Sequence, residues 1–413
     1  MFDVVFENCC GLDVHQRSVT ACVLRAKESG QGVERIFRTF GTTTHALEDL
    51  SAWLQQLGVT HVAMESTGVY WKPVYNILAS AIEVWIVNAQ HIKQVPGRKT
   101  DIKDAEWIAS LMRYGLLQPS YIPDVEQRDL RDLTRYRTRL IEERSAASNR
   151  LLKALEDANI KLSAVVSDIQ GVSARAMLEA LITGELEPEA LAEMARGRLR
   201  RKIPELTAAL TGHVRAHHQF WIRELLTQID ALNERIYVLD QEIEKRTEPH
   251  KELIARLMTV PGIGPHVAQI ILAEIGSDVE AFPSAKHLAS WACLCPGNNI
   301  SANKRRSGRT RKGQKWLRSA LVQAAWAASH TKDTYLAAQF WRLKARRGAK
   351  RAAIAVAHSI LVIVYHLLAD PEAVHRELGG DYFLKKNQEQ QKRRALRALN
   401  ALGYQVQLTP TAT

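Results

Sequence analysis

Hydrophobic and polar positions change their spacing along the chain, and this spacing divides it into parts. Over the first 124 residues, short apolar runs of strand length alternate with longer segments of helical period. Strands are predicted at residues 9–14, 19–24, 35–40, 61–65 and 84–87, and helices at 44–57, 70–79 and from 101 onward. This part is therefore predicted to be an α/β domain with a mixed sheet.

Residues 125–250 are polar, charged and helical in pattern, and they read as a helical spacer. Their second half carries apolar residues at alternating spacings of three and four: Ile222, Leu225, Ile229, Leu232, Ile236, Leu239 and Ile243. These residues form an apolar seam along one side of the predicted helix. Ile at one seam position and Leu at the other favours a parallel two-stranded coiled coil between two chains. The alternative is that the seam packs within one chain against a helix at residues 130–155, whose own pattern Arg137 and Arg144 interrupt. Residues 171–204 predict short connecting helices.

The rest of the chain is predicted to be mainly helical up to residue 375, followed by a basic tail at residues 376–413. Helices are expected at residues 314–330, 335–350 and 351–368, and the last is apolar on most faces and hence a core helix. The tail either contacts RNA or forms a solvated helix.

Charge and cysteine usage narrow the function classes. The net charge of +12 over 413 residues favours a polyanionic partner. The five cysteines show no zinc spacing and no disulfide framework, which indicates a reducing cytoplasm. We find no signal peptide and no apolar run of about 18 residues or more, so the sequence predicts a soluble protein without a membrane segment.

Four acidic residues are candidate metal ligands. Asp13 and Glu65 come at the ends of two predicted strands, while Asp101 and Asp104 lie three residues apart on one face of a predicted helix. Carboxylates at the ends of buried strands are costly without a counter-charge. Oxygen ligands without paired His or Cys suit Mg²⁺ or Mn²⁺, and two such ions catalyse phosphoryl transfer. The alternative for the helical pair is that it only offsets the helix dipole.

The order of elements favours the functional interpretation of these acids. Three strands followed by alternating helix and strand is the layout of the ribonuclease H fold. This layout predicts that Asp13, Glu65, Asp101 and Asp104 meet at one end of the sheet. The chemistry implied is cleavage or exchange of phosphodiesters.

Residues 257–268 lie between two apolar helical stretches and resemble a helix-hairpin-helix. In such a hairpin, Gly262 and Gly264 let the backbone approach a phosphate, and the helix begun by Pro265 presents its amino end to the charge. The alternative is a plain turn between helices.

Half of residues 303–318 are Lys or Arg, which predicts a flexible basic loop that binds phosphates. Its candidate phosphate-binding residues are Lys304, Arg305, Arg306, Arg309, Arg311 and Lys312. A solvated basic face is the alternative. Ser301 stands just before this segment, where a positive field would stabilise a pentacovalent phosphate and activate a hydroxyl.

Several short motifs together resemble one family, the DEDD insertion-sequence transposases, which include the Piv DNA invertase and the bridge-RNA-guided recombinases. The motifs are Gly11-Leu-Asp-Val-His15, Met64-Glu-Ser-Thr-Gly68, Lys99-Thr-Asp-Ile-Lys-Asp-Ala105, Val260-Pro-Gly-Ile-Gly264 and the block from Cys295 to Arg318. The resemblance spans nearly the whole chain, in the family's order.

The resemblance implies four parts and a chemistry. The parts are a RuvC-like DEDD catalytic domain at residues 1–124, a coiled-coil spacer for dimerisation at 125–250, a transposase domain at 251–375 and the tail at 376–413. Asp13, Glu65, Asp101 and Asp104 match the Mg²⁺-binding acids. The nucleophilic serine lands on Ser301. Because the family's serine is often followed by Gly, whereas Ala302 follows here, Ser307 before Gly308 is the alternative nucleophile.

The partners implied by the resemblance are double-stranded donor and target DNA, a noncoding bridge RNA, and further copies of the chain as a homo-dimer or homo-tetramer whose protomers share active sites. Two other functions are compatible with the residues. A RuvC-type endonuclease would use water as nucleophile, and a nonenzymatic nucleic-acid-binding protein would use only the hairpin and the basic loop.

Overall fold

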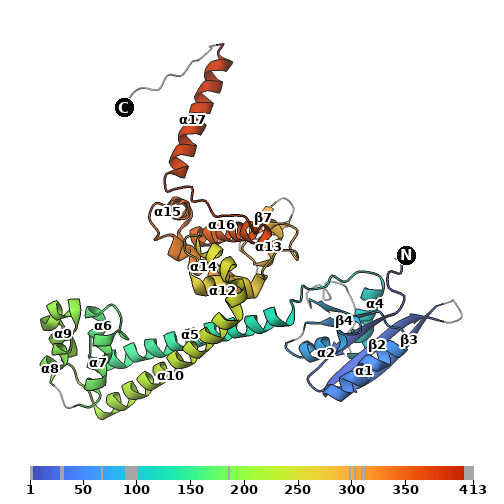
Figure 1. The fold of residues 1–413 in the computed structure, drawn as a ribbon, viewed down its shortest axis with the longest axis horizontal. Coiled ribbons are helices and arrows are strands. Elements are labelled where there is room, and N and C mark those ends of the chain that lie inside the picture. Colours follow the sequence, from blue (N-terminus) through green and yellow to red (C-terminus); the bar gives the residue numbers. More distant parts are fainter. Residues whose placement is uncertain are drawn as a thin grey trace. The chain divides into compact units, whose positions relative to one another are not determined.

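The chain folds as two compact units, Met1–Pro123 and Asp124–Thr413 (Figure 1). Each unit has hydrophobic cores of its own. The structure is a computed structural model that describes residues 3–27, 32–66, 68–88, 101–184, 187–296, 299–301, 304–307, 310 and 313–403. For residues 101–103, 299–301, 304–307 and 389–390 it describes the backbone without the side chains. The predicted divisions near residues 250 and 375 fall inside the second unit and stay predictions.

The first unit is built on one five-stranded sheet. Its strands are β1 (Cys9–Val14), β2 (Ser18–Ala26), β3 (Val33–Gly41), β4 (His61–Glu65) and β5 (Glu83–Val87). They lie in the order β3-β2-β1-β4-β5, antiparallel from β3 to β1 and parallel from β1 through β4 to β5. The five predicted strands and the mixed sheet are confirmed.

Among the described residues of this unit, helices α1 (Thr44–Gln56), α2 (Trp71–Leu78) and α4 (Asp101–Arg113) cover the two faces of the sheet. Because successive side chains of a strand point to opposite faces, β1 contributes to two separate cores. Cys10 and Leu12 pack with α1 and α2, whereas Cys9 packs with α4. The same alternation along β4 sends Met64 toward α1 and α2, and Ala63 toward α4.

Helix α4 lies directly on the backbone of β1. A Cβ added at Gly11 would stand 2.2 Å from the carbonyl oxygen of Ala105 and 2.4 Å from the amide nitrogen of Ala109. Only glycine therefore allows this approach, and the small residues Ala105 and Ala109 meet it from the helix. The close contact sets the position of α4 along the strand.

Three cysteines fill the interior of the sheet. Cys9, Cys10 and Cys22 are fully buried, and all five cysteines of the chain are free thiols. Burial raises the pKa of Cys9 to about 11 and that of Cys22 to about 12, because a thiolate would lose its hydration there. These thiols are therefore protonated at neutral pH and act as apolar core residues.

The second unit begins with two long helices that run side by side (Figure 1): α5 (Val125–Asp157) and α10 (Ala216–Thr247). Asp124 caps α5, because its carboxylate accepts a hydrogen bond of 2.7 Å from the amide of Gln127. Leu140 of α5 forms a small core with Leu232 and Ile236 of α10.

The prediction that the α10 seam joins two chains is corrected by this packing. Six of the seven seam residues are at most 6% exposed within a single chain and Leu239 is half-buried; the six are Ile222, Leu225, Ile229, Leu232, Ile236 and Ile243. The predicted alternative, packing against the helix at 130–155, is what the structure shows. Arg137 and Arg144 do not break the pair, since each has a polar partner on α10, Asp240 and Asn233 respectively.

Short helices enclose the end of the α5–α10 pair, as the pattern of residues 171–204 predicts. They are α6 (Leu162–Val165), α7 (Val172–Leu181), α8 (Pro188–Glu193), the 3-10 helix η1 (Gly197–Lys202) and α9 (Ile203–Leu210). Their apolar side chains share one core with Leu151 and Leu155 of α5 and Ile222 and Ile229 of α10.

The remaining elements form a helical domain with a small hairpin. They are η2 (Glu248–His250), α11 (Lys251–Met258), α12 (Pro265–Ile275), α13 (Ala285–Trp291), β6 (Asn299–Ser301), β7 (Lys304–Ser307), α14 (Lys315–Ala328), α15 (Tyr335–Arg347), α16 (Ala349–Ala369) and α17 (Tyr382–Ala401). The antiparallel pair β6–β7 corrects the prediction of a flexible loop here. Strand β6 is Asn-Ile-Ser and β7 is Lys-Arg-Arg-Ser, so the pair lacks the apolar alternation by which strands are predicted.

Helix α16 is the core of this domain, as predicted from its apolar pattern. Val356, Ile360, Leu361 and Val364 are fully buried among the neighbouring helices. By length and composition alone the helix would be able to cross a membrane, which corrects the expectation that no apolar run of that length occurs. Half of its most apolar stretch is buried inside the protein, as in a core helix.

Replacement of Gly11 by alanine is expected to destabilise the first unit. The new methyl group would force α4 away from β1, and such overpacking costs about 1–3 kcal/mol of unfolding free energy. Urea unfolding followed by circular dichroism measures the loss. Gly41→Ala is the matched control, since its Cβ would meet only the Ala46 side chain at an ordinary 3.5 Å. Equal stability of the two variants would contradict the close packing of α4.

Candidate functional site

Two of the predicted acids lie on neighbouring strands at the same level of the sheet. Strands β1 and β4 are parallel, with Leu12 opposite Met64, so Asp13 and Glu65 are the next residues along each strand. Leu12 and Met64 point toward α1 and α2. Asp13 and Glu65 therefore point to the opposite face, the one that α4 covers.

Helix α4 brings the other two acids to the same end of the sheet. Gly11 faces Ala105, and the thiol of Cys9 contacts the carbonyl oxygen of Ala109 at 3.6 Å. The helix therefore runs opposite to β1, and its first turn, with Asp101 and Asp104, lies toward the Asp13 end of the strand. The side chain of Asp101 is outside the described part of the structure.

The carboxylate donors suit a hard divalent cation, but those whose side chains are described, on Asp13, Glu65 and Asp104, do not form a metal-ligand cluster among themselves. Asp13 pairs with the ring of His15 at 3.0 Å and is only 20% exposed. Among the described side chains, no group of three or more His, Cys, Asp or Glu residues could hold a metal ion. The candidate site is thus one end of the sheet, where Asp13, Glu65 and Asp104 lie on the α4 side. The fourth predicted acid, Asp101, has no described side chain.

The two glycines of the predicted helix-hairpin-helix have different surroundings. Gly262 has a φ of +90°, and a Cβ there would stand 2.1 Å from the carbonyl oxygen of Ala324 on α14. Packing between α14 and the turn accounts for this glycine. Gly264 is the N-cap residue just before α12 and has open space where its Cβ would be. Of the two, Gly264 is the one whose surroundings leave room for a ligand.

The hairpin β6–β7 carries both candidate nucleophiles on its backbone. Ser301 is opposite Lys304 beside the turn, and Ser307 is opposite Asn299 at the other end. The two serines are therefore on different strands and at opposite ends of the hairpin. Lys304, Arg305 and Arg306 lie on β7, whereas Arg309, Arg311 and Lys312 are outside the described residues.

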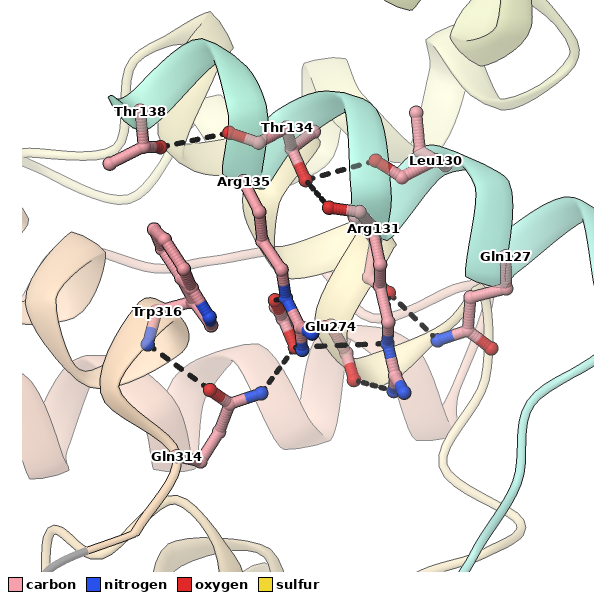
Figure 2. A network of polar contacts seen from close by, with 10 residues as sticks. Gln127, Leu130, Arg131, Thr134, Arg135, Thr138, Glu274, Gln314 and Trp316 are labelled. Atoms are coloured by element: carbon pink, nitrogen blue, oxygen red, sulfur yellow. Dashed lines mark hydrogen bonds and ion pairs between the residues drawn. The ribbon is translucent and has the colours of Figure 1, made fainter. Parts of the chain in front are cut away.

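The buried carboxylate of Glu274 bonds to Gln314, which follows this hairpin in the sequence. Glu274, near the end of α12, is fully buried, and Arg135 of α5 donates to both of its oxygens at 2.7 and 2.8 Å. Arg131 lies 3.7 Å from the same carboxylate and donates to two α12 carbonyl groups, including that of Glu274. Figure 2 shows the carboxylate enclosed by these side chains.

Gln314 connects this network to α14. Its amide donates to Glu274, while its carbonyl oxygen accepts from the amide of Trp316 at 3.1 Å and so caps α14 (Figure 2). The carboxylate of Glu274 on α12 thus bonds to α5 and to the N-cap residue of α14. Sequence reasoning missed Glu274, although a single charge inside the apolar run Ala-Gln-Ile-Ile-Leu-Ala-Glu-Ile is a detectable signal.

Comparison with known proteins identifies the class. A family model described as "Transposase" matches residues 10–160, and a second, described as "Transposase IS116/IS110/IS902 family", matches residues 254–342. The first match covers nearly the whole sheet and all four candidate acids, and the second runs from within α11 to within α15 and includes the hairpin β6–β7.

Curated relatives agree with the family models. The transposase for insertion sequence element IS1111A of Coxiella burnetii is 26% identical over 76% of this chain and 79% of its own length. A probable family 20 transposase of Pseudomonas aeruginosa is 26% identical over 77% of this chain and 86% of its own. The pilin gene-inverting protein of Moraxella bovis is also 26% identical, over 87% and 94%.

These matches define a transposase, a class of enzyme that transfers DNA strands. The chain belongs to the DEDD transposases of insertion sequences, the IS110/IS116/IS902 family. The resemblance deduced from the sequence motifs is thereby confirmed, as is DNA as a partner.

Glu274→Gln is expected to destabilise the second unit strongly. The substitution keeps the size of the side chain but leaves Arg131 and Arg135 without their buried counter-charge, which typically costs about 3 kcal/mol of unfolding free energy. Thermal or urea unfolding measures the change. Glu234→Gln removes an exposed carboxylate from α10 and serves as the control. Equal unfolding midpoints would show that the network contributes no stability.

A pair of glycine substitutions tests the turn before α12. Gly262→Ala should cost about 1–3 kcal/mol, because its methyl group would collide with the α14 backbone at a φ that disfavours alanine. Gly264→Ala should cost less, about 0.5–1 kcal/mol, because its methyl group meets open space and only the preference for glycine over alanine at a helix N-cap is lost. Comparable losses in both variants would contradict the packing described for Gly262.

Proposed function

We propose that this transposase exchanges DNA strands through a covalent serine–DNA intermediate, with an acidic Mg²⁺ site in the first unit and Ser301 in the second. The observation that supports it best is that Asp13 and Glu65 stand at the same level on the neighbouring parallel strands β1 and β4. Both lie on the sheet face that is covered by α4, the helix of Asp101 and Asp104.

The strand arrangement supports a RuvC-like, ribonuclease H-like first unit. In this sheet three antiparallel strands are extended by two parallel ones, with β1 at the centre between β2 and β4. The crossovers through α1 and α2 place helices on the face opposite to α4. This arrangement leaves the acids on the α4 side, at the carboxyl ends of β1 and β4.

Asp13, Glu65, Asp101 and Asp104 would hold Mg²⁺, or Mn²⁺ in its place, because they offer only oxygen donors. When bound, such an ion supplies the positive charge that polarises a phosphate and favours ionisation of a hydroxyl. His15 holds the Asp13 carboxylate in one orientation through their 3.0 Å contact.

The serine chemistry conserves the number of phosphodiester bonds. The Ser301 oxygen attacks a DNA phosphorus and loses its proton, a serine–phosphate ester forms, and one P–O bond of the DNA breaks to release a hydroxyl. The hydroxyl of an incoming strand then attacks the same phosphorus and releases the serine with its proton. No high-energy cofactor is consumed. Lys304, Arg305 and Arg306 on β7 supply positive charge next to Ser301 in the chain.

The proposed partners are donor and target DNA duplexes and a noncoding bridge RNA that pairs with them, in the bacterial cytoplasm. The net charge of +12 suits all three polyanions. A homo-dimer or homo-tetramer is part of this proposal, but its interface must use a surface other than the α10 seam, which the chain buries against its own α5.

The proposal is tested by trapping the intermediate. Purified protein is incubated with DNA spanning the junction of its insertion sequence, the adjacent noncoding RNA and Mg²⁺, and protein-linked DNA is detected on a denaturing gel. Wild type should form the adduct. Ser301→Ala and Asp104→Asn should each reduce it by at least about 100-fold, as expected for loss of a nucleophile or a metal ligand.

Other outcomes have distinct meanings. An adduct that survives Ser301→Ala but is lost in Ser307→Ala moves the nucleophile to Ser307. Cleavage without any adduct identifies a RuvC-type endonuclease that uses water. Full DNA binding with no cleavage under any condition identifies a nonenzymatic binding protein.

A further inference from the structure

A cavity of about 470 Å³ opens between α5, α12 and α14, beside the Glu274 network. Its walls include arginines of α5, the first residues of α12 and an indole of α14: Arg135, Arg137, Arg144, Gly264, His266 and Trp316. Ile141, Val267 and Ile270 add an apolar side. The cavity lies entirely within the second unit, and the roles proposed for the acids and the serine do not use it.

The cationic groups of the cavity are only partly neutralised. Arg135 is paired with Glu274, and Arg137 is paired with Asp240 on α10. Arg144 instead donates to the neutral amide oxygen of Asn233 at 2.9 Å, and among the described side chains it has no carboxylate partner. The half-buried guanidinium of Arg144 therefore keeps its charge available at the cavity wall.

Arg137 and His266 further shape this wall. Arg137 donates to the Nε2 atom of His266 at 2.9 Å, which requires that this nitrogen carries no proton. His266 follows Gly264 and Pro265 in the first turn of α12, where the free amide groups of the helix face an anion favourably. The amino end of α12 and the arginines therefore both attract an anion.

Trp316 supplies an aromatic surface to the cavity lining. Its half-buried ring lies 5.1 Å from the guanidinium of Arg139, 5.9 Å from that of Arg135 and 4.4 Å from the ammonium of Lys315. Figure 2 shows the indole beside Arg135. Proteins bind single-stranded nucleic acid with aromatic rings in a positively charged groove, and this cavity holds both an indole and an arginine whose charge is not neutralised.

We propose that this cavity binds one nucleotide of an unpaired DNA or RNA strand, with its phosphate at Arg144 and the start of α12 and its base against Trp316. A base within a duplex has both faces stacked and cannot reach an indole in a cavity, whereas a base in an unpaired strand can. The inference depends on the proposed function only in taking a nucleic acid as the partner, and not on the serine or the metal.

The test measures binding in full-length protein that carries Ser301→Ala, with EDTA present, so that no cleavage occurs. Labelled single-stranded DNA, single-stranded RNA of the same sequence, and duplex DNA are titrated and followed by fluorescence anisotropy. Trp316→Ala should weaken single-strand binding roughly 5- to 100-fold, and Trp316→Phe should keep most of it because the ring persists. The difference between the DNA and RNA arms identifies which strand the cavity prefers.

Arg144→Gln should also weaken single-strand binding and lower the slope of log affinity against log salt by about one. Arg150→Gln is the matched control, since Arg150 is exposed on the same helix and does not line the cavity. Duplex binding should be nearly equal in all variants.

A photocrosslink gives a readout that does not depend on the folding of a variant. A strand with 5-bromouracil should crosslink to the peptide that contains Trp316 in the otherwise unaltered protein. Crosslinks elsewhere, equal losses for Arg144→Gln and Arg150→Gln, or equal losses of duplex and single-strand binding would each overturn the cavity as a nucleotide site. Failure of adduct formation by the wild type, with cavity binding intact, would refute the proposed chemistry alone.

Discussion

The buried carboxylate of Glu274 is the interaction on which the organisation of the second unit depends. A charge with no exposed surface is stable only when its neighbours supply both counter-charge and hydrogen bonds. Arg131 and Arg135 of α5 and Gln314 before α14 do so. The long helix, the hairpin domain and the start of α14 are therefore tied to one point, and the arginine-lined cavity opens beside it.

In the first unit, the equivalent constraint is steric and not electrostatic. The absence of a side chain at Gly11 lets α4 lie on the backbone of β1, and the helix is then held with its first turn toward Asp13. Alternation along β1 and β4 directs Asp13 and Glu65 to that same face. Steric contact in the first unit and a buried ion pair in the second thus both hold polar side chains on rigid elements.

Much of the secondary structure was predictable because it depends on the local pattern of apolar and polar residues. The strands around Asp13 and Glu65 have short apolar runs, α16 has apolar residues on most faces, and the short helices at residues 171–204 follow Gly and Pro. The family followed from short motifs in a set order. The helix that pairs with the α10 seam could not be predicted from the sequence, since a heptad pattern specifies an apolar stripe without specifying which helix covers it. The hairpin of Ser301 was also missed, because its strands have no apolar alternation.

The sequence by itself determined the α/β class of the first unit, the helical character of the second, the acidic and basic candidate residues, and membership of the transposase family. Only the tertiary structure decided that α10 pairs with α5 of its own chain, that Gly262 is a packing glycine while Gly264 stays open, and that Glu274, Arg144 and Trp316 belong to adjoining parts of one region. The physical reason is separation along the chain: Arg135 and Glu274 are 139 residues apart, and no local period relates two residues at that distance.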